Sequence, residues 1–90
     1  MIRLIWSDKF EGRYRKWARR HPDLISTFER KIILFEEAPF HPSLKTHTLR
    51  GNLKEVWSIY INYEHRLTFR FEEENTKAIL ITIGTHDEVY

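Results

Sequence analysis

The sequence has 90 residues and a mass of 11.0 kDa, and we expect residues 1–90 to form one small domain. Hydrophobic residues make up 41% of the chain and aromatic residues 14%, which excludes a disordered chain. The lack of cysteine excludes disulfides, thiolate nucleophiles and cysteine-based zinc sites. Apolar runs are too short to cross a bilayer, and charged residues interrupt the start of the chain. We therefore expect a cytoplasmic protein without a signal peptide.

Positive charge is concentrated in two parts of the chain, although the formal net charge is only +2. Residues 1–22 have a net charge of +5 and residues 38–70 one of +3, whereas residues 71–90 have −4. This distribution indicates one side that faces a polyanion. An ordinary solvated helix surface would give the same pattern in residues 1–22, so both interpretations stay open.

The first half of the chain predicts a short strand and two helices. Residues 1–6 predict the strand, and Ser7 is a suitable N-cap for the first helix. Apolar residues then recur at helical spacing: Phe10, Tyr14, Trp17, Ala18 and His21. Pro22 ends this helix and opens a second, which we expect to reach about Glu37. Its buried stripe is Ile25, Phe28, Ile32 and Phe35. The short link predicts an antiparallel helical hairpin.

The second half predicts three antiparallel strands after a loop with two prolines at residues 38–43. Alternation of period two marks strands at residues 56–61 and 66–71, and the apolar run at 78–83 suits a central strand. Turns are expected at residues 62–65 and 72–76. The predicted fold is α+β, in the order β-α-α-β-β-β, with the helical hairpin packed on a mostly antiparallel four-stranded sheet. The core is expected to hold all three tryptophans: Trp6, Trp17 and Trp57.

The expected strand at residues 66–71 predicts a polar sheet face. Because Leu67, Phe69 and Phe71 must face the helices, the intervening residues lie on the opposite side of the sheet. The side chains expected there are Arg66, Thr68, Arg70, Ser58 and Tyr60. An antiparallel sheet with one covered face and one wet face of this kind suits an anionic ligand.

Few residues point to a specific chemistry. The five histidines show no metal-binding spacing, the sequence has no phosphate-binding loop or dinucleotide motif, and we expect no cofactor and no metal. Metal-free cleavage of a phosphodiester needs a base, an acid and a fixed cation. His47, Arg66 and His86 have the side chains for these roles, but the sequence alone does not show that they converge.

A family resemblance is carried by the motifs L-x-G-N-L…W-S-I, E-H-R-L-T-F and G-T-H, within residues 47–71 and 83–90. In order and spacing these motifs resemble the RelE/ParE superfamily of bacterial toxins, most of all the branch with the YafQ and YoeB toxins. The resemblance covers nearly the whole chain and implies a RelE-like fold. It implies the toxin of a type II toxin–antitoxin system, a ribosome-dependent endoribonuclease (an mRNA interferase) that inhibits translation by cutting mRNA in the decoding site. The implied partners are mRNA, the ribosome with its 16S rRNA, and a cognate antitoxin in a hetero-oligomer.

The resemblance assigns catalytic roles to His86 and Arg66. His86 lies in the G-T-H motif, where the family keeps a general acid, and the alternative is a histidine that caps a carbonyl at a strand end. Arg66 matches the arginine that binds the scissile phosphate. Its alternative is an ion pair with Glu64 or Glu72 on the sheet.

Four further positions follow from the same resemblance. His47 falls where the YafQ-like branch has histidine and the YoeB-like branch glutamate, so it is either the general base or a solvated loop histidine. Tyr90 matches an aromatic residue beside the catalytic histidine, and it either stacks on a base or packs on the sheet. Tyr60 and Glu64 replace a histidine and an aspartate of YafQ-like enzymes, which puts in doubt whether proton transfer proceeds here as it does in them.

A basic set of residues is expected to bind RNA, although part of it can face an antitoxin instead. Its basic members are Arg13, Lys16, Arg19, Arg20, Lys45, Arg50, Lys54 and Arg70, and the aromatic Tyr60 belongs to the same expected RNA-binding surface. Two other functions share this fold. One is a ParE-like inhibitor of DNA gyrase without nuclease activity, and the other is an inactive toxin-fold protein that only binds an antitoxin.

Overall fold

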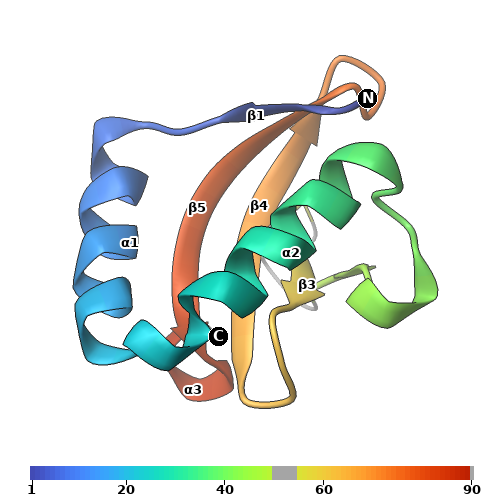
Figure 1. The fold of residues 1–90 in the computed structure, drawn as a ribbon. Coiled ribbons are helices and arrows are strands. Elements are labelled where there is room, and N and C mark those ends of the chain that lie inside the picture. Colours follow the sequence, from blue (N-terminus) through green and yellow to red (C-terminus); the bar gives the residue numbers. More distant parts are fainter. Residues whose placement is uncertain (50–54, 90) are drawn as a thin grey trace.

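A five-stranded sheet in the order β1-β5-β4-β3-β2 forms the centre of the protein in a computed structural model that describes residues 1–49 and 55–89 (Figure 1). The strands are β1 (Arg3–Ile5), β2 (His47–Thr48), β3 (Trp57–Tyr60), β4 (His65–Glu72) and β5 (Lys77–Thr85). β1 pairs in parallel with β5, and the other neighbouring strands are antiparallel. The α+β class is confirmed, but the predicted count of four strands is wrong. β2 has two residues, too few to show alternation in the sequence.

The helices begin and end where local chemistry dictates. α1 (Asp8–Arg20) starts after Ser7, whose hydroxyl accepts a hydrogen bond from the Phe10 amide at 3.1 Å. Its last residue is Arg20 and its C-cap is His21, because Pro22 follows. A single 3-10 turn (Pro22–Leu24) leads into α2 (Ile25–Glu37). The predicted N-cap at Ser7, the break between the helices at Pro22 and the end of the second helix at Glu37 are confirmed.

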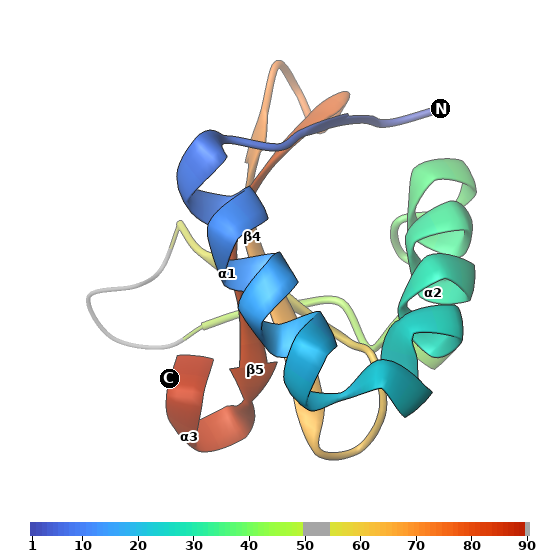
Figure 2. The same ribbon diagram turned by 60° about the vertical axis from the view of Figure 1, so that its left-hand side comes forward.

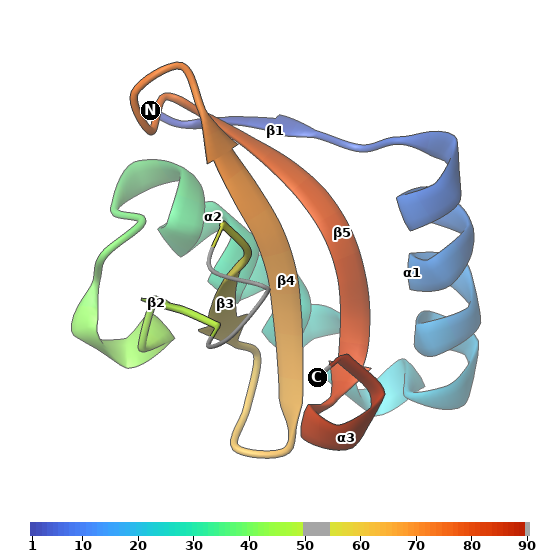
Figure 3. The ribbon, with the colours of Figure 1, turned by 180° about the vertical axis from the view of Figure 1, so that it is seen from behind.

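The two helices meet at the 3-10 turn and diverge from it, as Figure 2 shows. α1 runs alongside β5, whereas α2 crosses in front of β4 and β3 (Figure 1). Aromatic rings fill the space between the helices, with the centroids of Tyr14 and Phe28 4.7 Å apart. The helical pair therefore covers one face of the sheet, and seen from behind β4 and β5 carry neither α1 nor α2 (Figure 3).

The core lies between the sheet and the helices. Its fully buried large side chains come from both helices and from all three long strands: Phe10, Phe35, Ile59, Leu67, Phe69 and Leu80. Trp17 is 4% exposed, as predicted. The prediction for Trp6 is wrong because this residue follows β1 at the edge of the molecule, where it packs on Phe10 and stays 39% exposed. Trp57 is only partly buried.

The opposite face of the sheet is less exposed than predicted. Arg66 is 7% exposed, and Thr68 and Ser58 are fully buried, while Arg70 is exposed as expected. Short side chains on this face lie among larger neighbours and are shielded by them. The polar face predicted to be open to water is thus a face of buried polar groups with an exposed rim.

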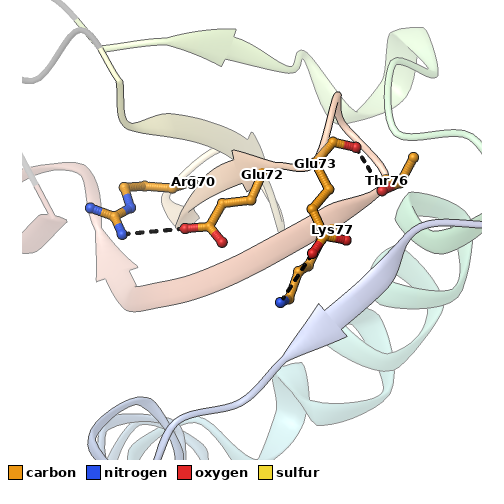
Figure 4. A network of polar contacts seen from close by, with 5 residues as sticks. All are labelled: Arg70, Glu72, Glu73, Thr76 and Lys77. Carbon is orange, nitrogen blue, oxygen red and sulfur yellow. Dashed lines mark hydrogen bonds and ion pairs between the residues drawn. The ribbon is translucent and has the colours of Figure 1, made fainter.

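An acidic turn joins β4 to β5 at the end of the sheet away from the short C-terminal helix α3 (His86–Val89) (Figures 1 and 3). Three of its residues have positive φ angles: Glu73, Glu74 and Asn75. Figure 4 shows that Thr76 donates a hydrogen bond to the Glu73 carbonyl at 2.7 Å and that Lys77 lies 3.7 Å from the Glu73 carboxylate. Three of the five acidic residues of the last twenty therefore lie at the end opposite α3, where Lys77 pairs with one of them.

Candidate functional site

The strand register places the candidate residues on the face of the sheet that the helices leave uncovered. One cross-strand row contains His47, Ser58, Thr68 and Thr82, and the next contains Tyr60, Arg66 and Gly84. Both rows face away from the core, because the residues between them along each strand are buried against the helices. His86 follows Gly84 by two residues. His47 and Arg66 thus lie on the same side of the sheet, and His86 begins the helix that follows the Gly84 strand.

Arg66 is the centre of this arrangement. Its guanidinium lies over the ring of Tyr60, with the Cζ atom 3.6 Å from the ring centroid. Its Nη1 donates hydrogen bonds to the carbonyls of Asn62 at 2.8 Å and His65 at 3.3 Å. These contacts fix the orientation of the guanidinium, and none of them, among the described residues, neutralises its charge.

No carboxylate among the described residues forms an ion pair with Arg66. Glu72, one of the two partners weighed from the sequence, lies 3.7 Å from Arg70 instead (Figure 4). A nearly buried cation that lacks a carboxylate is costly, and an anionic ligand would remove that cost. The alternative weighed from the sequence, an ion pair of Arg66 with Glu64 or Glu72, is therefore not found in the described part of the chain.

Asn62 supports this site, and the sequence analysis overlooked it. Its side-chain oxygen accepts hydrogen bonds from the amides of Glu64 at 2.9 Å and His65 at 2.7 Å, while its carbonyl binds Arg66. This Asx turn closes the β3–β4 connection and orients Arg66 at the same time. The signal was present in the sequence as an asparagine at the start of a four-residue connection between two strands.

His47 lies on β2 at the edge of the sheet. Its Nδ1 is 2.7 Å from the carbonyl oxygen of Lys45. Because a carbonyl can only accept, Nδ1 carries the proton and Nε2 of the neutral ring is left as the basic atom. That tautomer is the one a general base acting through Nε2 needs.

His86 begins α3, directly after β5. Its side chain is 60% exposed, its Nδ1 lies 3.7 Å from a carboxylate oxygen of Asp87, and its amide donates to the carbonyl of Glu64 at 3.3 Å. The backbone contact attaches the start of α3 to the β3–β4 connection, next to Arg66. The side chain of His86 is therefore more than half exposed, while its backbone is held against the β3–β4 connection.

Arg66 lies between the two histidines. β2 and β4 are two strands apart, and Arg66 is offset by two residues from the row of His47. Ideal sheet spacing therefore places the His47 backbone about 10 Å from that of Arg66 across the sheet and about 7 Å along it. His86 lies beyond Gly84, which pairs directly with Arg66.

A basic cavity adjoins this site between α1 and β5. It has a volume of about 210 Å³ and is lined by Arg13, Lys16 and Arg20, together with Thr82 and Glu88. Arg13 Nη1 donates a 2.7 Å hydrogen bond to the carbonyl of Ile81. Arg19 does not line the cavity, so the structure separates it from the three basic residues with which the sequence analysis grouped it.

The remaining candidates occupy different places. Lys45 Nζ lies 5.6 Å from the ring centroid of Tyr60, and the Arg66 guanidinium packs over the same ring. Tyr60 thus contacts two cations. Arg70 lies four residues along β4 from Arg66, toward the acidic turn. Three candidates lie outside the described residues: Arg50, Lys54 and Tyr90.

A buried pair of side chains lies behind the site, on the core side. Trp17 Nε1 donates a 3.0 Å hydrogen bond to His65 Nδ1, and the His21 ring packs on His65 with centroids 4.5 Å apart. Burial lowers the pKa of His65, and the neighbouring His21 lowers it further. His65 is therefore held neutral with its proton on Nε2.

Acidification is expected to destabilise the protein through His65. Its pKa in the folded state lies below the ordinary value of 6.5, so the unfolded chain takes up a proton first as the pH falls below that value. The free energy of unfolding then decreases until the pH passes the folded-state pKa. Urea unfolding at about pH 7.5 and about pH 5.5 measures the loss.

The control for this prediction is His65→Gln. The glutamine oxygen can still accept the Trp17 N–H bond but does not titrate, so this variant should lose less stability on acidification than the wild type. An equal loss in both proteins would assign the pH dependence to another group.

Neither a membrane-spanning helix nor a metal-binding cluster is found in residues 1–49 and 55–89. No helix there combines the length and apolarity needed to cross a bilayer. Three or more His, Asp or Glu side chains do not gather anywhere in those ranges in a way that could hold a metal ion.

Comparison with known proteins shows the fold. No family model and no curated protein sequence matches the chain. Among solved structures, a YoeB/ParE toxin from Agrobacterium tumefaciens is 24% identical with a TM-score of 0.75, over 94% of this chain and 99% of the toxin. YafQ from Escherichia coli is 15% identical with a TM-score of 0.79, over 100% and 99%. A metal-bound toxin from Helicobacter pylori is 22% identical with a TM-score of 0.78, over the full length of both chains. The fold expected from the RelE/ParE resemblance is confirmed.

Proposed function

We propose that this protein is the toxin of a toxin–antitoxin pair and that it cuts mRNA bound to the ribosome. The observation that carries the proposal is the Arg66 guanidinium, nearly buried, oriented by two carbonyls and Tyr60, and without a carboxylate partner among the described residues. A phosphodiester is the anion that suits this group, because a planar guanidinium matches phosphate oxygens with paired hydrogen bonds. The shared fold with YoeB/ParE and YafQ toxins supports the same conclusion.

The proposed reaction uses the two histidines on either side of Arg66. His47 Nε2 takes the proton of the ribose 2′-hydroxyl, and the 2′-oxygen attacks the adjacent phosphorus. Arg66 stabilises the negative charge that develops on the phosphoryl oxygens. The bond from phosphorus to the 5′-oxygen breaks, and His86 donates a proton to that oxygen. The products are a 2′,3′-cyclic phosphate and a 5′-hydroxyl, and no metal ion takes part.

The partners follow from the same proposal. The ribosome presents the mRNA in the cytoplasm, and an antitoxin with a segment that folds on binding holds the toxin inactive. The basic cavity on α1 and the exposed rim of the sheet are surfaces that RNA or an antitoxin can reach.

Primer extension on cellular mRNA after induced expression tests the proposal. We expect new 5′ ends within codons soon after induction, together with arrest of growth. DNA damage with intact mRNA would support the gyrase-inhibitor alternative instead. Expression without any toxicity would support an inactive antitoxin-binding protein.

The basic cavity provides a separate prediction about RNA affinity. Replacing Lys16 with alanine should weaken binding to a single-stranded RNA and lower the slope of log affinity against log salt by about 0.7 to 1 unit, the value for one phosphate contact. Arg15→Ala is the matched control, because Arg15 directly precedes Lys16 in α1 but is paired with Glu11 at 2.7 Å. Equal slopes for the two variants would place the RNA elsewhere.

A further inference from the structure

The start of α3 is held by two reciprocal hydrogen bonds. The Glu88 carboxylate accepts a hydrogen bond from the Thr85 amide at 2.8 Å, and the Thr85 hydroxyl accepts one from the Glu88 amide at 3.3 Å. This pattern is a capping box, in which the residue before the helix and its third residue satisfy each other's amides. His86 is the first residue inside the box. An isolated helix of four residues does not hold its shape in water, so the box is what orders α3 and His86 with it.

Glu88 also packs on the sheet, and only glycine at position 84 permits this. A Cβ atom at position 84 would lie 2.9 Å from Glu88 Oε1 and 3.1 Å from Glu88 Cβ. Gly84 is the direct cross-strand partner of Arg66. The Glu88 side chain therefore lies over the strand position next to Arg66 and brings α3 down onto the candidate site.

The environment keeps Glu88 ionised. The Thr85 amide and hydroxyl hold the pKa of Glu88 below its usual range, against the effect of burial, and Arg20 in the basic cavity adds to the lowering. An ionised carboxylate is the stronger acceptor for the Thr85 amide. Its negative charge next to a proposed phosphate site would oppose RNA binding, so direct contact with the phosphate is not its role.

We infer that Glu88 is a positioning residue, which together with Thr85 and Gly84 holds the His86 imidazole in place to protonate the leaving oxygen. The inference rests on the proposed function of His86, and it adds a role for a residue that does not touch the RNA. In physical terms, loss of the capping box lets α3 unwind and moves the His86 imidazole away from the leaving oxygen. A displacement of about 1 Å can cost a reaction about 100-fold.

The test compares Glu88→Ala with Glu88→Gln in cleavage of mRNA on purified ribosomes. Glutamine keeps an oxygen that can accept the Thr85 amide, whereas alanine removes it. We expect the maximal cleavage rate of E88A to fall about 10- to 100-fold without any loss of RNA affinity, and E88Q to retain most of the wild-type rate. Glu29→Ala, which removes an exposed glutamate of α2, is the matched control and should cut at the wild-type rate.

A double-variant experiment distinguishes positioning from other roles. If Glu88 acts through His86, E88A should cause no further loss once His86 has been replaced by alanine. Losses that multiply in the double variant would overturn the inference, and so would an E88A protein that cuts at the wild-type rate. If E88A fails to fold, Thr85→Val and Thr85→Ser test the same box, with Ser expected to rescue what Val loses.

A measurement without RNA separates this inference from the proposed function. Hydrogen exchange of the Thr85 amide should be about fivefold faster in E88A than in the wild type and in E88Q, as expected for the loss of one hydrogen bond. A wild-type protein that does not cut RNA would count against the proposed function. An unchanged Thr85 amide would count against the capping box and hence against the positioning role of Glu88.

Discussion

Replacing Arg66 with alanine is expected to lower RNA cleavage by about 100- to 1000-fold or more and to abolish growth arrest. Removing one preorganised group that stabilises developing charge has an effect of this size in other enzymes. The protein should still fold, because the His65 carbonyl keeps its bond from the Ile61 amide and only the Asn62 carbonyl loses its donor. The expected loss of unfolding free energy is about 1 kcal/mol. Growth after induction and cleavage on ribosomes measure the effect on activity, and urea unfolding measures the effect on stability.

Arg70→Ala is the matched control for this prediction. Arg70 belongs to the same strand and the same sheet face, but it is exposed and lies 3.7 Å from Glu72 (Figure 4). Because Arg70 belongs to the set expected to bind RNA, its loss should weaken RNA affinity by one phosphate contact but leave the maximal rate of cleavage little changed. Arg66→Lys separates charge from shape, because an ammonium cannot reproduce the planar fork of a guanidinium, and it should recover only a small part of the activity. Equal activities of the Arg66→Ala and Arg70→Ala proteins would remove Arg66 from the site.

Replacing His86 with alanine is expected to lower cleavage by about 100- to 10,000-fold, the usual contribution of a general acid. The fold should be intact, because the His86 side chain is 60% exposed and the amide that contacts Glu64 remains. A change in unfolding free energy within about 0.5 kcal/mol is typical of such a surface position. The measurement is again toxicity after induction, with the rate of cleavage on ribosomes at saturating enzyme.

His41→Ala is the control for the histidine experiment. His41 is also exposed, but its ring accepts a hydrogen bond from the Ser43 amide at 3.1 Å and is not on the candidate face. The His41→Ala protein should arrest growth like the wild type. Undiminished toxicity of the His86→Ala protein would show that the proton of the leaving group comes from elsewhere.

The predictions from local patterns agree closely with the structure. A serine that can cap, a proline that cannot continue a helix and apolar residues at spacing 3.6 or 2 act over a few residues. The bounds of α1 and α2 and the positions of β4 and β5 follow from them. The placement of Arg66 on the side of the sheet away from the helices also follows, because alternation along a strand is strict.

Predictions that depended on distant neighbours were less accurate. β2 exists only because His47 and Thr48 pair with β3, and two residues have no periodicity of their own. The exposure of Trp6 depends on where β1 leaves the sheet. The burial of Arg66 depends on Tyr60 and on the Asn62 turn, and nothing within β4 itself indicates either partner.

The amino-acid sequence by itself determined the α+β class, the order of the main helices and strands, and the side of the sheet that bears Arg66, because side-chain periodicity and caps depend on near neighbours. Only the tertiary structure decided that Arg66 lacks a carboxylate partner in the described chain, that three of the α1 cations line one cavity, and that Glu88 folds back over Gly84. These features depend on register between strands and on the packing of α1 and α3 against β5. Contacts of that kind join residues far apart in the chain, and no local pattern encodes them.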